Sequence, residues 1–133
     1  MIDHISIAVR DLKKAEPFYV ALLAPLGMTK LREWPDAAIG FGKKYPEFWI
    51  NKRTAMGRVA DDSGVHFCLR AADTAAVDAF HAAALKAGGS SDGAPGLRTK
   101  YHANYYAAFI RDPDGNRIEA VTFVKDGANN KNG

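Results

Sequence analysis

The chain has 133 residues, which is typical of one domain that buries roughly two-thirds of the surface its unfolded form exposes. Its formal net charge is +3, but its Lys and Arg residues are scattered among acidic ones, so we expect no nucleic-acid partner, and charged residues interrupt every apolar stretch well before the roughly 18 residues of a membrane span. Cys68 is the only cysteine, which excludes an intrachain disulfide and, with no signal-peptide pattern near the amino terminus, predicts a cytoplasmic protein.

The chain begins with a predicted strand and helix. Residues 4–9 alternate between two faces, with Ile5, Ile7 and Val9 on one and His4 on the other. Asp11 follows, and its carboxylate can accept a hydrogen bond from the first turn of a helix, a placement worth about 1 kcal/mol. We expect this helix to run toward Gly27, with a kink or a late start at Pro17, because proline removes a helical hydrogen bond.

Three short strands are predicted after this helix, at residues 28–34, 37–42 and 47–51. Residues 53–63 lack apolar periodicity, so we interpret them as a connector between the two halves of the chain.

The second half repeats the first at an offset of 62 residues, without a gap. The repeat preserves an alternating strand, an acidic helix cap, a helical apolar stripe and a final glycine. The identical pairs are His4 and His66, Asp11 and Asp73, Phe18 and Phe80, Ala21 and Ala83, Leu23 and Leu85, and Gly27 and Gly89. Two copies of one strand–helix–strands unit are therefore expected.

The strands of the second copy are predicted at about residues 90–99, 104–111 and 117–124. Glycine, serine and proline crowd residues 88–96, so the first of them is alternatively a loop. Residues 112–116 predict a tight turn that joins the last two strands as a hairpin. Residues 125–133 are polar and rich in glycine and asparagine, which predicts a flexible tail.

The repeat, the paired histidines and the run Asp-Pro-Asp-Gly-Asn-Arg-Ile-Glu at residues 112–119 resemble the vicinal oxygen chelate superfamily over residues 2–124. That group includes glyoxalase I, bleomycin-resistance proteins, fosfomycin-resistance enzymes, methylmalonyl-CoA epimerase and extradiol dioxygenases. The resemblance implies one α+β domain over residues 1–124. It would consist of two βαβββ modules, residues 1–52 and 64–124, which form a curled, cup-shaped mixed sheet with the helices outside.

The resemblance also implies metal ligands on the first and last strands of the modules, and His4, His66 and Glu119 fall at those positions. Two imidazoles and a carboxylate suit Zn, Ni, Mn or Fe and leave sites open for substrate oxygens. Glu119 is then also the candidate base. The alternative is structural: two histidines hydrogen-bonded inside the sheet and a glutamate at its rim.

The chain departs from the four-ligand members of the superfamily. The aligned place for their extra ligand is Trp49 or Ile50, neither of which binds metal, and Glu47 could serve only after a register slip. A set of two histidines and one glutamate instead resembles the fosfomycin-resistance branch.

Five further residues are candidates for substrate binding: Trp49, His102, Tyr105, Tyr106 and Arg117. Amphipathic rings suit a pocket wall, and an arginine can bind an anion. The alternatives are hairpin packing, core filling and a surface charge.

Two functions follow as hypotheses. The first is a glyoxalase-like metalloenzyme of the isomerase, lyase or transferase type, whose small-molecule substrate binds the metal through neighbouring oxygens. The second is a metal-free protein that binds a drug or metabolite, as bleomycin-resistance proteins do. A homodimer is expected because the superfamily commonly completes its cups between chains. Extradiol ring cleavage is less favoured, since those enzymes resemble doubled versions of this unit.

Overall fold

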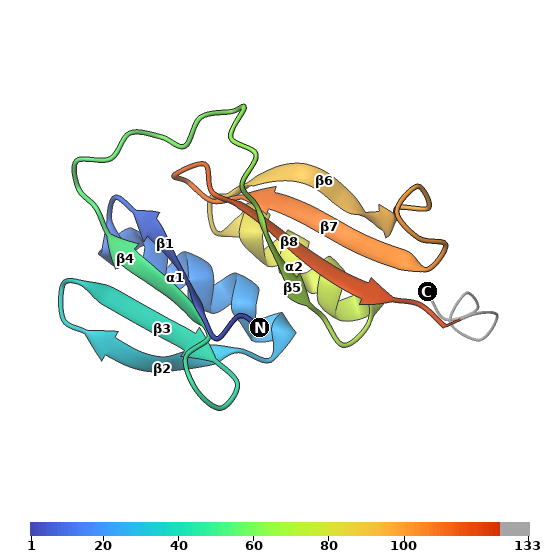
Figure 1. The fold of residues 1–133 in the computed structure, drawn as a ribbon, viewed down its shortest axis with the longest axis horizontal. Helices are drawn as coiled ribbons and strands as arrows, with labels where there is room; N and C mark the ends of the chain where they lie inside the picture. The colour runs from blue at the N-terminus through green and yellow to red at the C-terminus, as the bar shows by residue number, and fades with distance from the viewer. Residues whose placement is uncertain (126–133) are drawn as a thin grey trace.

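Two four-stranded sheets, one from each half of the chain, lie side by side with the helices behind them (Figure 1). The computed structural model describes residues 1–125, so most of the tail predicted at 125–133 lies outside the described residues. The first half contains β1 (Ile5–Val9), α1 (Leu12–Leu23), the 3-10 helix η1 (Ala24–Leu26), β2 (Thr29–Trp34), β3 (Ala38–Gly42) and β4 (Phe48–Lys52). The second half contains β5 (Phe67–Arg70), α2 (Thr74–Lys86), β6 (Ser90–Leu97), β7 (Tyr105–Arg111) and β8 (Arg117–Phe123).

The two sheets have the same topology. Their strand orders are β1-β4-β3-β2 and β5-β8-β7-β6. In each sheet the first strand of the module pairs in parallel with the last, and the other neighbours are antiparallel. The predicted α+β fold of two βαβββ modules with mixed sheets is confirmed.

Both helices begin at the aspartates that the repeat indicated. The Asp11 carboxylate accepts a hydrogen bond from the Lys14 amide at 3.1 Å, and the Asp73 carboxylate accepts one from Ala76 at 2.8 Å. Helix α1 starts directly at Leu12, so Pro17 lies inside the helix and does not delay its start.

Residues 90–97 form a strand rather than a loop, but an irregular one. The pairing of β6 with β7 shifts register on both sides of Gly93, whose φ is 157°. These bulges interrupt the period of two on which strand prediction depends, which explains the weak sequence signal there.

One apolar core joins the modules. Helix α1 packs against α2, and each helix packs against the sheet of its own module. The buried rings of Phe18, Tyr19, Phe41, Phe48 and Phe80 all belong to this single cluster. Full burial of one such side chain contributes roughly 1.5–3 kcal/mol, so the two modules stabilise each other.

A buried polar contact also joins the modules. Asp112, in the turn between β7 and β8, is 2% exposed. The Tyr19 hydroxyl of α1 donates to Asp112 Oδ2 at 2.6 Å, and the Asn116 amide donates both to Asp112 Oδ2 and to the Ala8 carbonyl of β1, each at 2.9 Å. Burial raises the pKa of Asp112, although the hydrogen bonds from Tyr19 and Asn116 oppose this shift.

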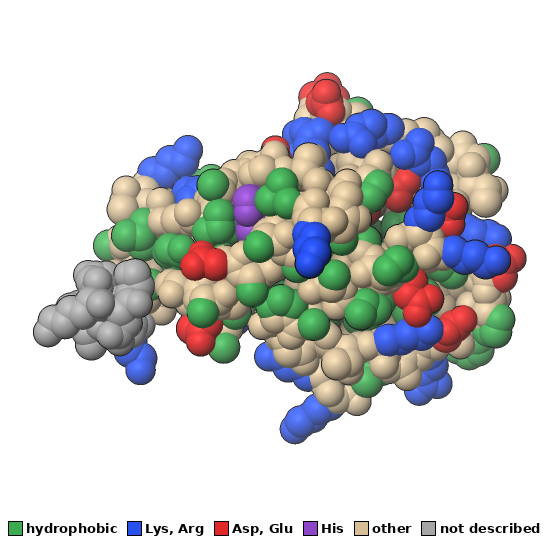
Figure 2. Space-filling view, turned by 180° about the vertical axis from the view of Figure 1, so that it is seen from behind, with side chains coloured by type: hydrophobic (Ala, Val, Ile, Leu, Met, Phe, Trp, Pro, Cys, Tyr) green, Lys and Arg blue, Asp and Glu red, His purple; other side chains and the backbone are tan. Residues whose placement is uncertain are grey.

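The face of the molecule drawn in Figure 2 carries side chains of mixed character. Seen from behind, apolar, basic and acidic side chains are interspersed (Figure 2). Within residues 1–125, no helix is long and apolar enough to cross a membrane.

The Tyr19–Asp112 hydrogen bond gives the first prediction. Tyr19→Phe should lower the free energy of unfolding by about 1–3 kcal/mol, because the buried Asp112 carboxyl loses a donor. Urea denaturation at pH 7 measures the change. Tyr45→Phe is the matched control, since Tyr45 is 49% exposed and its hydroxyl reaches only the Asp3 carbonyl at 3.5 Å. Equal unfolding midpoints for the two variants would contradict the prediction.

Candidate functional site

The side chains of the candidate site lie on the face of the second sheet that is turned away from the helices. In a strand, successive side chains point to opposite faces. Ile118 and Ala120 are buried against the core, so Glu119 between them points to the open face. Cys68 of β5 and Phe109 of β7 are its cross-strand partners. The pairing of β5 with β8 therefore brings residues from the two ends of the module together.

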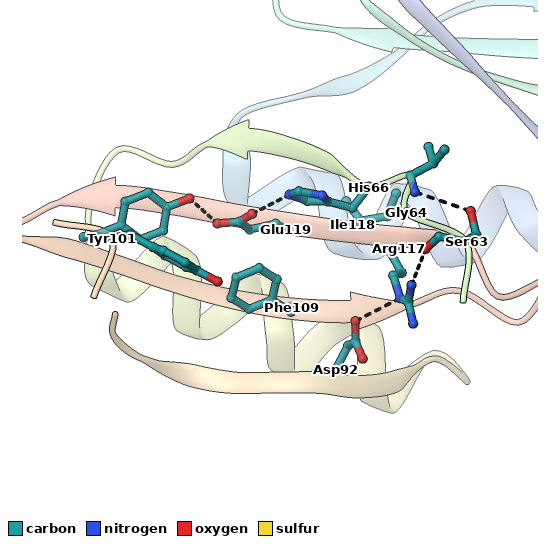
Figure 3. A pocket seen from close by; sticks show the side chains of 11 residues that line it. Ser63, Gly64, His66, Asp92, Tyr101, Phe109, Arg117, Ile118 and Glu119 are labelled. Atoms are coloured by element: carbon teal, nitrogen blue, oxygen red, sulfur yellow. Dashed lines mark hydrogen bonds and ion pairs between the residues drawn. The ribbon is translucent and has the colours of Figure 1, made fainter. Parts of the chain in front are cut away.

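A hollow of about 460 Å³ lies on this open face (Figure 3). Strands β7 and β8 supply its floor, the segment before β7 supplies Tyr101, and the connector before β5 supplies another wall. The lining residues are Ser63, Gly64, Val65, His66, Asp92, Tyr101, Tyr105, Phe109, Arg117, Ile118 and Glu119. The volume suits a small organic ligand.

Glu119 is the polar centre of the hollow. It is 2% exposed. His66 Nε2 lies 3.0 Å from Glu119 Oε1, and the Tyr105 hydroxyl donates a hydrogen bond to Oε2. A carboxylate withdrawn from water is stable only when donors satisfy it, and here each oxygen has one. The three side chains form a connected polar network at the floor, and Figure 3 shows the contact between His66 and Glu119.

Tyr105 and Cys68, which both lie beside Glu119, are held in their protonated forms. Burial, together with the hydrogen bond to Glu119, raises the pKa of Tyr105 far above its usual value, so its hydroxyl is a donor throughout the physiological range. Burial and the negative charge of Glu119 likewise raise the pKa of the Cys68 thiol to about 12. Cys68 is thus an unactivated thiol.

Arg117 lines the hollow, but its guanidinium holds the connector. Nη1 donates to the Ser63 carbonyl and Nη2 to the Asp61 carbonyl, each at 2.6 Å, while Nε lies 3.3 Å from Asp92 Oδ2. Arg111 adds an ion pair with the Asp61 carboxylate at 2.7 Å. The connector is thereby fixed as a wall of the hollow.

His4 does not join the His66–Glu119 pair in a three-residue group. Its Nδ1 is 2.7 Å from Asp3 Oδ1, and its ring lines a second hollow, of about 530 Å³, at the junction of β1 and β5. His66 and Cys68 also line that junction. Among residues 1–125, no three His, Cys, Asp or Glu side chains form a group that could hold a metal ion.

Trp49 occupies in the first module the place that Glu119 occupies in the second. It pairs with Ser6 of β1, as Glu119 pairs with Cys68 of β5. A Cβ added at Gly40 would come within 3.0 Å of the indole, so this glycine lets the ring lie close to the sheet. The equivalent positions thus carry an aromatic surface in one module and a carboxylate in the other.

Three of the predicted substrate-binding residues, Trp49, His102 and Tyr106, do not line the hollow, and Trp49 belongs to the first module. The Tyr106 hydroxyl donates to Asp78 of α2 at 2.6 Å, on the helix side of the sheet. His102 accepts a hydrogen bond from the Asn104 amide at 3.0 Å, and its ring packs edge-to-face against Phe123. Strand alternation separates Tyr106 from Tyr105, because neighbours along a strand face opposite sides.

Several lining residues were not predicted from the sequence. Phe109 could have been predicted from the sequence, because strand alternation along β7 places it on the same face as Tyr105. Asp92 could not, because it lies beside the bulge at Gly93. Residues 63–65 belong to the connector, whose path over the sheet depends on contacts with Arg117 rather than on local pattern.

Comparison with known proteins gives one family match. Residues 1–120 match the family described as the Glyoxalase/Bleomycin resistance protein/Dioxygenase superfamily. No curated protein matches the chain.

Solved structures show the same fold. A glyoxalase/bleomycin resistance protein from Albidiferax ferrireducens T118 is 29% identical, with a TM-score of 0.76 over 90% of this chain and 95% of that one. A glyoxalase/bleomycin resistance protein/dioxygenase from Alicyclobacillus acidocaldarius is 22% identical, with a TM-score of 0.68 over 95% and 93% of the two chains. A fosfomycin resistance protein from Mesorhizobium loti is 17% identical, with a TM-score of 0.65 over 92% and 91%.

The raised pKa of Cys68, about 12, predicts slow alkylation. At pH 7 its reaction with iodoacetamide should be on the order of a hundredfold slower than that of a free thiol, because the smaller thiolate fraction outweighs the higher nucleophilicity of each thiolate. Mass spectrometry of timed samples measures the rate. Glu119→Gln should accelerate the reaction by removing a nearby negative charge, whereas Glu33→Gln, far from the thiol in an ion pair with Lys30, should not. A wild-type rate equal to that of free cysteine would refute the assignment.

Proposed function

The chain belongs to the glyoxalase/bleomycin resistance protein/dioxygenase superfamily, and we propose that it is a glyoxalase-like enzyme that uses a divalent metal ion to act on a small molecule through neighbouring oxygens. The observation that carries this proposal is the pairing of His66 with Glu119, 3.0 Å apart, at the floor of a ligand-sized hollow. The reaction would be of the isomerase, lyase or transferase type.

The side chains of His66 and Glu119 are of the kinds that bind divalent metal ions. An imidazole and a carboxylate suit Zn, Ni, Mn or Fe, and His66 and Glu119 already share one side of the sheet. Tyr105 donates to the second oxygen of Glu119, as outer partners of metal-binding carboxylates commonly do. Two protein ligands are one fewer than a typical catalytic site has, so the proposal requires one more.

We assign the third position to His4 of a second copy of the chain. His4 is the repeat counterpart of His66, yet within one chain it pairs with Asp3 and remains 54% exposed. The open face of the first sheet carries His4 and Trp49, and a symmetric dimer would bring that face over the hollow of its partner. Trp49 would then complete the wall that Tyr101 and Tyr105 begin.

The residues of the hollow would divide the chemical work. A bound ion would polarise the substrate oxygens as a Lewis acid. Glu119 would accept a proton from the substrate if it is released from the ion, since proton transfer needs an acceptor within hydrogen-bond reach. The Tyr105 hydroxyl would orient Glu119, and the connector wall held by Arg117 would exclude water from the site.

A metal-free binding protein is the second candidate function. Both oxygens of Glu119 have hydrogen-bond donors within the chain, so the buried carboxylate needs no ion for its stability. The resemblance to four-ligand members implies a further ligand at Trp49 or Ile50, and neither of these side chains binds metal. In this case the hollow would sequester its ligand without transforming it.

Metal content separates the two candidates. Chelated protein reconstituted with Zn, Ni, Mn or Fe(II) should hold about one ion per chain, and His66→Ala and His4→Ala should each reduce this below about a tenth, because a two-ligand site binds weakly. Plasma mass spectrometry after gel filtration gives the stoichiometry. His81→Ala is the control, since His81 hydrogen-bonds Ser91 outside the site. Wild-type protein that takes up less than a tenth of an equivalent would overturn the metal proposal.

A mixing experiment tests the shared site. Variants His4→Ala and His66→Ala, refolded together, should recover about a quarter of the wild-type metal, because half of randomly formed dimers are mixed and each of these contains one intact site. Sedimentation of the wild type should give twice 14.4 kDa. A lone 14.4 kDa species, or no recovery on mixing, would contradict a site built from two chains.

A further inference from the structure

We propose that the hollow on the second sheet binds an aromatic ring that carries a hydroxyl group, with Phe109 as its packing surface. This inference rests on the hollow being the ligand site of the proposed function, but not on the presence of a metal. It follows from how the Phe109 ring is fixed, from its position beside Glu119 and from the charges around it.

The Phe109 ring is held in place by its neighbours. Gly93 of β6 lies so close that an added Cβ would come within 2.9 Å of the ring. The Arg98 guanidinium lies over the ring, 5.4 Å from its centroid, and donates hydrogen bonds to the Ala94 and Gly96 carbonyls. A ring restrained in this way loses little freedom when a ligand packs against it.

Phe109 lies directly beside the buried carboxylate. It is the cross-strand partner of Glu119, and side chains at such positions have Cβ atoms about 4.5–5.5 Å apart. A planar ring placed against Phe109 would therefore bring one substituent to Glu119 and His66 (Figure 3).

Two tyrosines extend the aromatic surface. Tyr101 and Tyr105 contact each other edge-to-face with centroids 5.3 Å apart, and both line the hollow with Phe109. Aromatic rings favour other aromatic rings as edge or offset partners beyond simple burial of area. An aromatic ligand is consequently favoured over an aliphatic one of equal size.

The charges of the hollow favour a hydrogen-bond donor over an anion. The Arg117 guanidinium is engaged by two connector carbonyls and Asp92, which leaves its charge largely compensated. Asp92 is likewise compensated, since it lies 3.3 Å from Arg117 Nε and 3.7 Å from Arg111 Nε. Glu119 is therefore the charge of the hollow that would repel a carboxylate ligand. A hydroxyl group can instead donate to a carboxylate oxygen of Glu119, which retains lone pairs beyond those used by His66 and Tyr105.

A pair of matched probes tests the inference in chelated wild-type protein. 4-Methylphenol and 4-methylcyclohexanol have the same hydroxyl group and nearly the same size, but only the first is aromatic. Amide shifts in two-dimensional NMR spectra give both dissociation constants. We expect 4-methylphenol to bind at least about fivefold more tightly, with shifts at Gly93, Phe109 and Glu119.

Two variants locate the effect. Phe109→Leu keeps the site apolar and should weaken 4-methylphenol about fivefold while leaving 4-methylcyclohexanol unchanged. Phe123→Leu is the control, because Phe123 packs on Tyr105 without lining the hollow. Equal binding of the two probes, tighter binding of 4-methylbenzoate, or equal losses in both variants would overturn the inference. Because no metal is present, these outcomes are independent of those that decide the metal proposal.

Discussion

The site depends on one constraint: the Glu119 carboxylate is almost completely withdrawn from water and must be paired with donors. The parallel pairing of β5 with β8 meets this requirement, since it places His66 at one carboxylate oxygen, and the antiparallel pairing with β7 places Tyr105 at the other. Unsatisfied, such a group would cost several kcal/mol. The same contacts that make the carboxylate tolerable therefore also fix its orientation toward the hollow.

The two modules show how one duplicated framework can hold different chemistry. Their sheets share strand order and register, so Trp49 and Glu119 stand at equivalent places. The indole of Trp49 provides an aromatic surface where Glu119 provides a polar centre, and the hydrogen-bonded pairing of the strands is the same in both modules. The shared apolar core and the Tyr19–Asp112 contact then keep the modules together, so that each open face is free to differ.

Much of the fold could be predicted because its signals are local. Alternation in residues 4–9, the capping aspartates Asp11 and Asp73 and the turn at 112–116 are each readable within a few residues, and the repeat links them. The site was harder, since its geometry depends on side chains from distant segments. Tyr105 and Arg117 line the hollow, whereas Tyr106 faces α2, and the roles of Asp92 and the connector depend on a bulge and on long-range hydrogen bonds that no local pattern reveals.

The connector is the part of the hollow whose sequence can change most easily. Arg117 anchors the connector through the backbone carbonyls of Asp61 and Ser63, and Arg111 adds an ion pair with the Asp61 carboxylate, so connector side chains other than that of Asp61 are under less structural demand. Loops in such positions accept substitutions and changes in length more readily than strands do. Substitutions in this segment alone can consequently change the ligand preference, while the two duplicated sheets keep their structure.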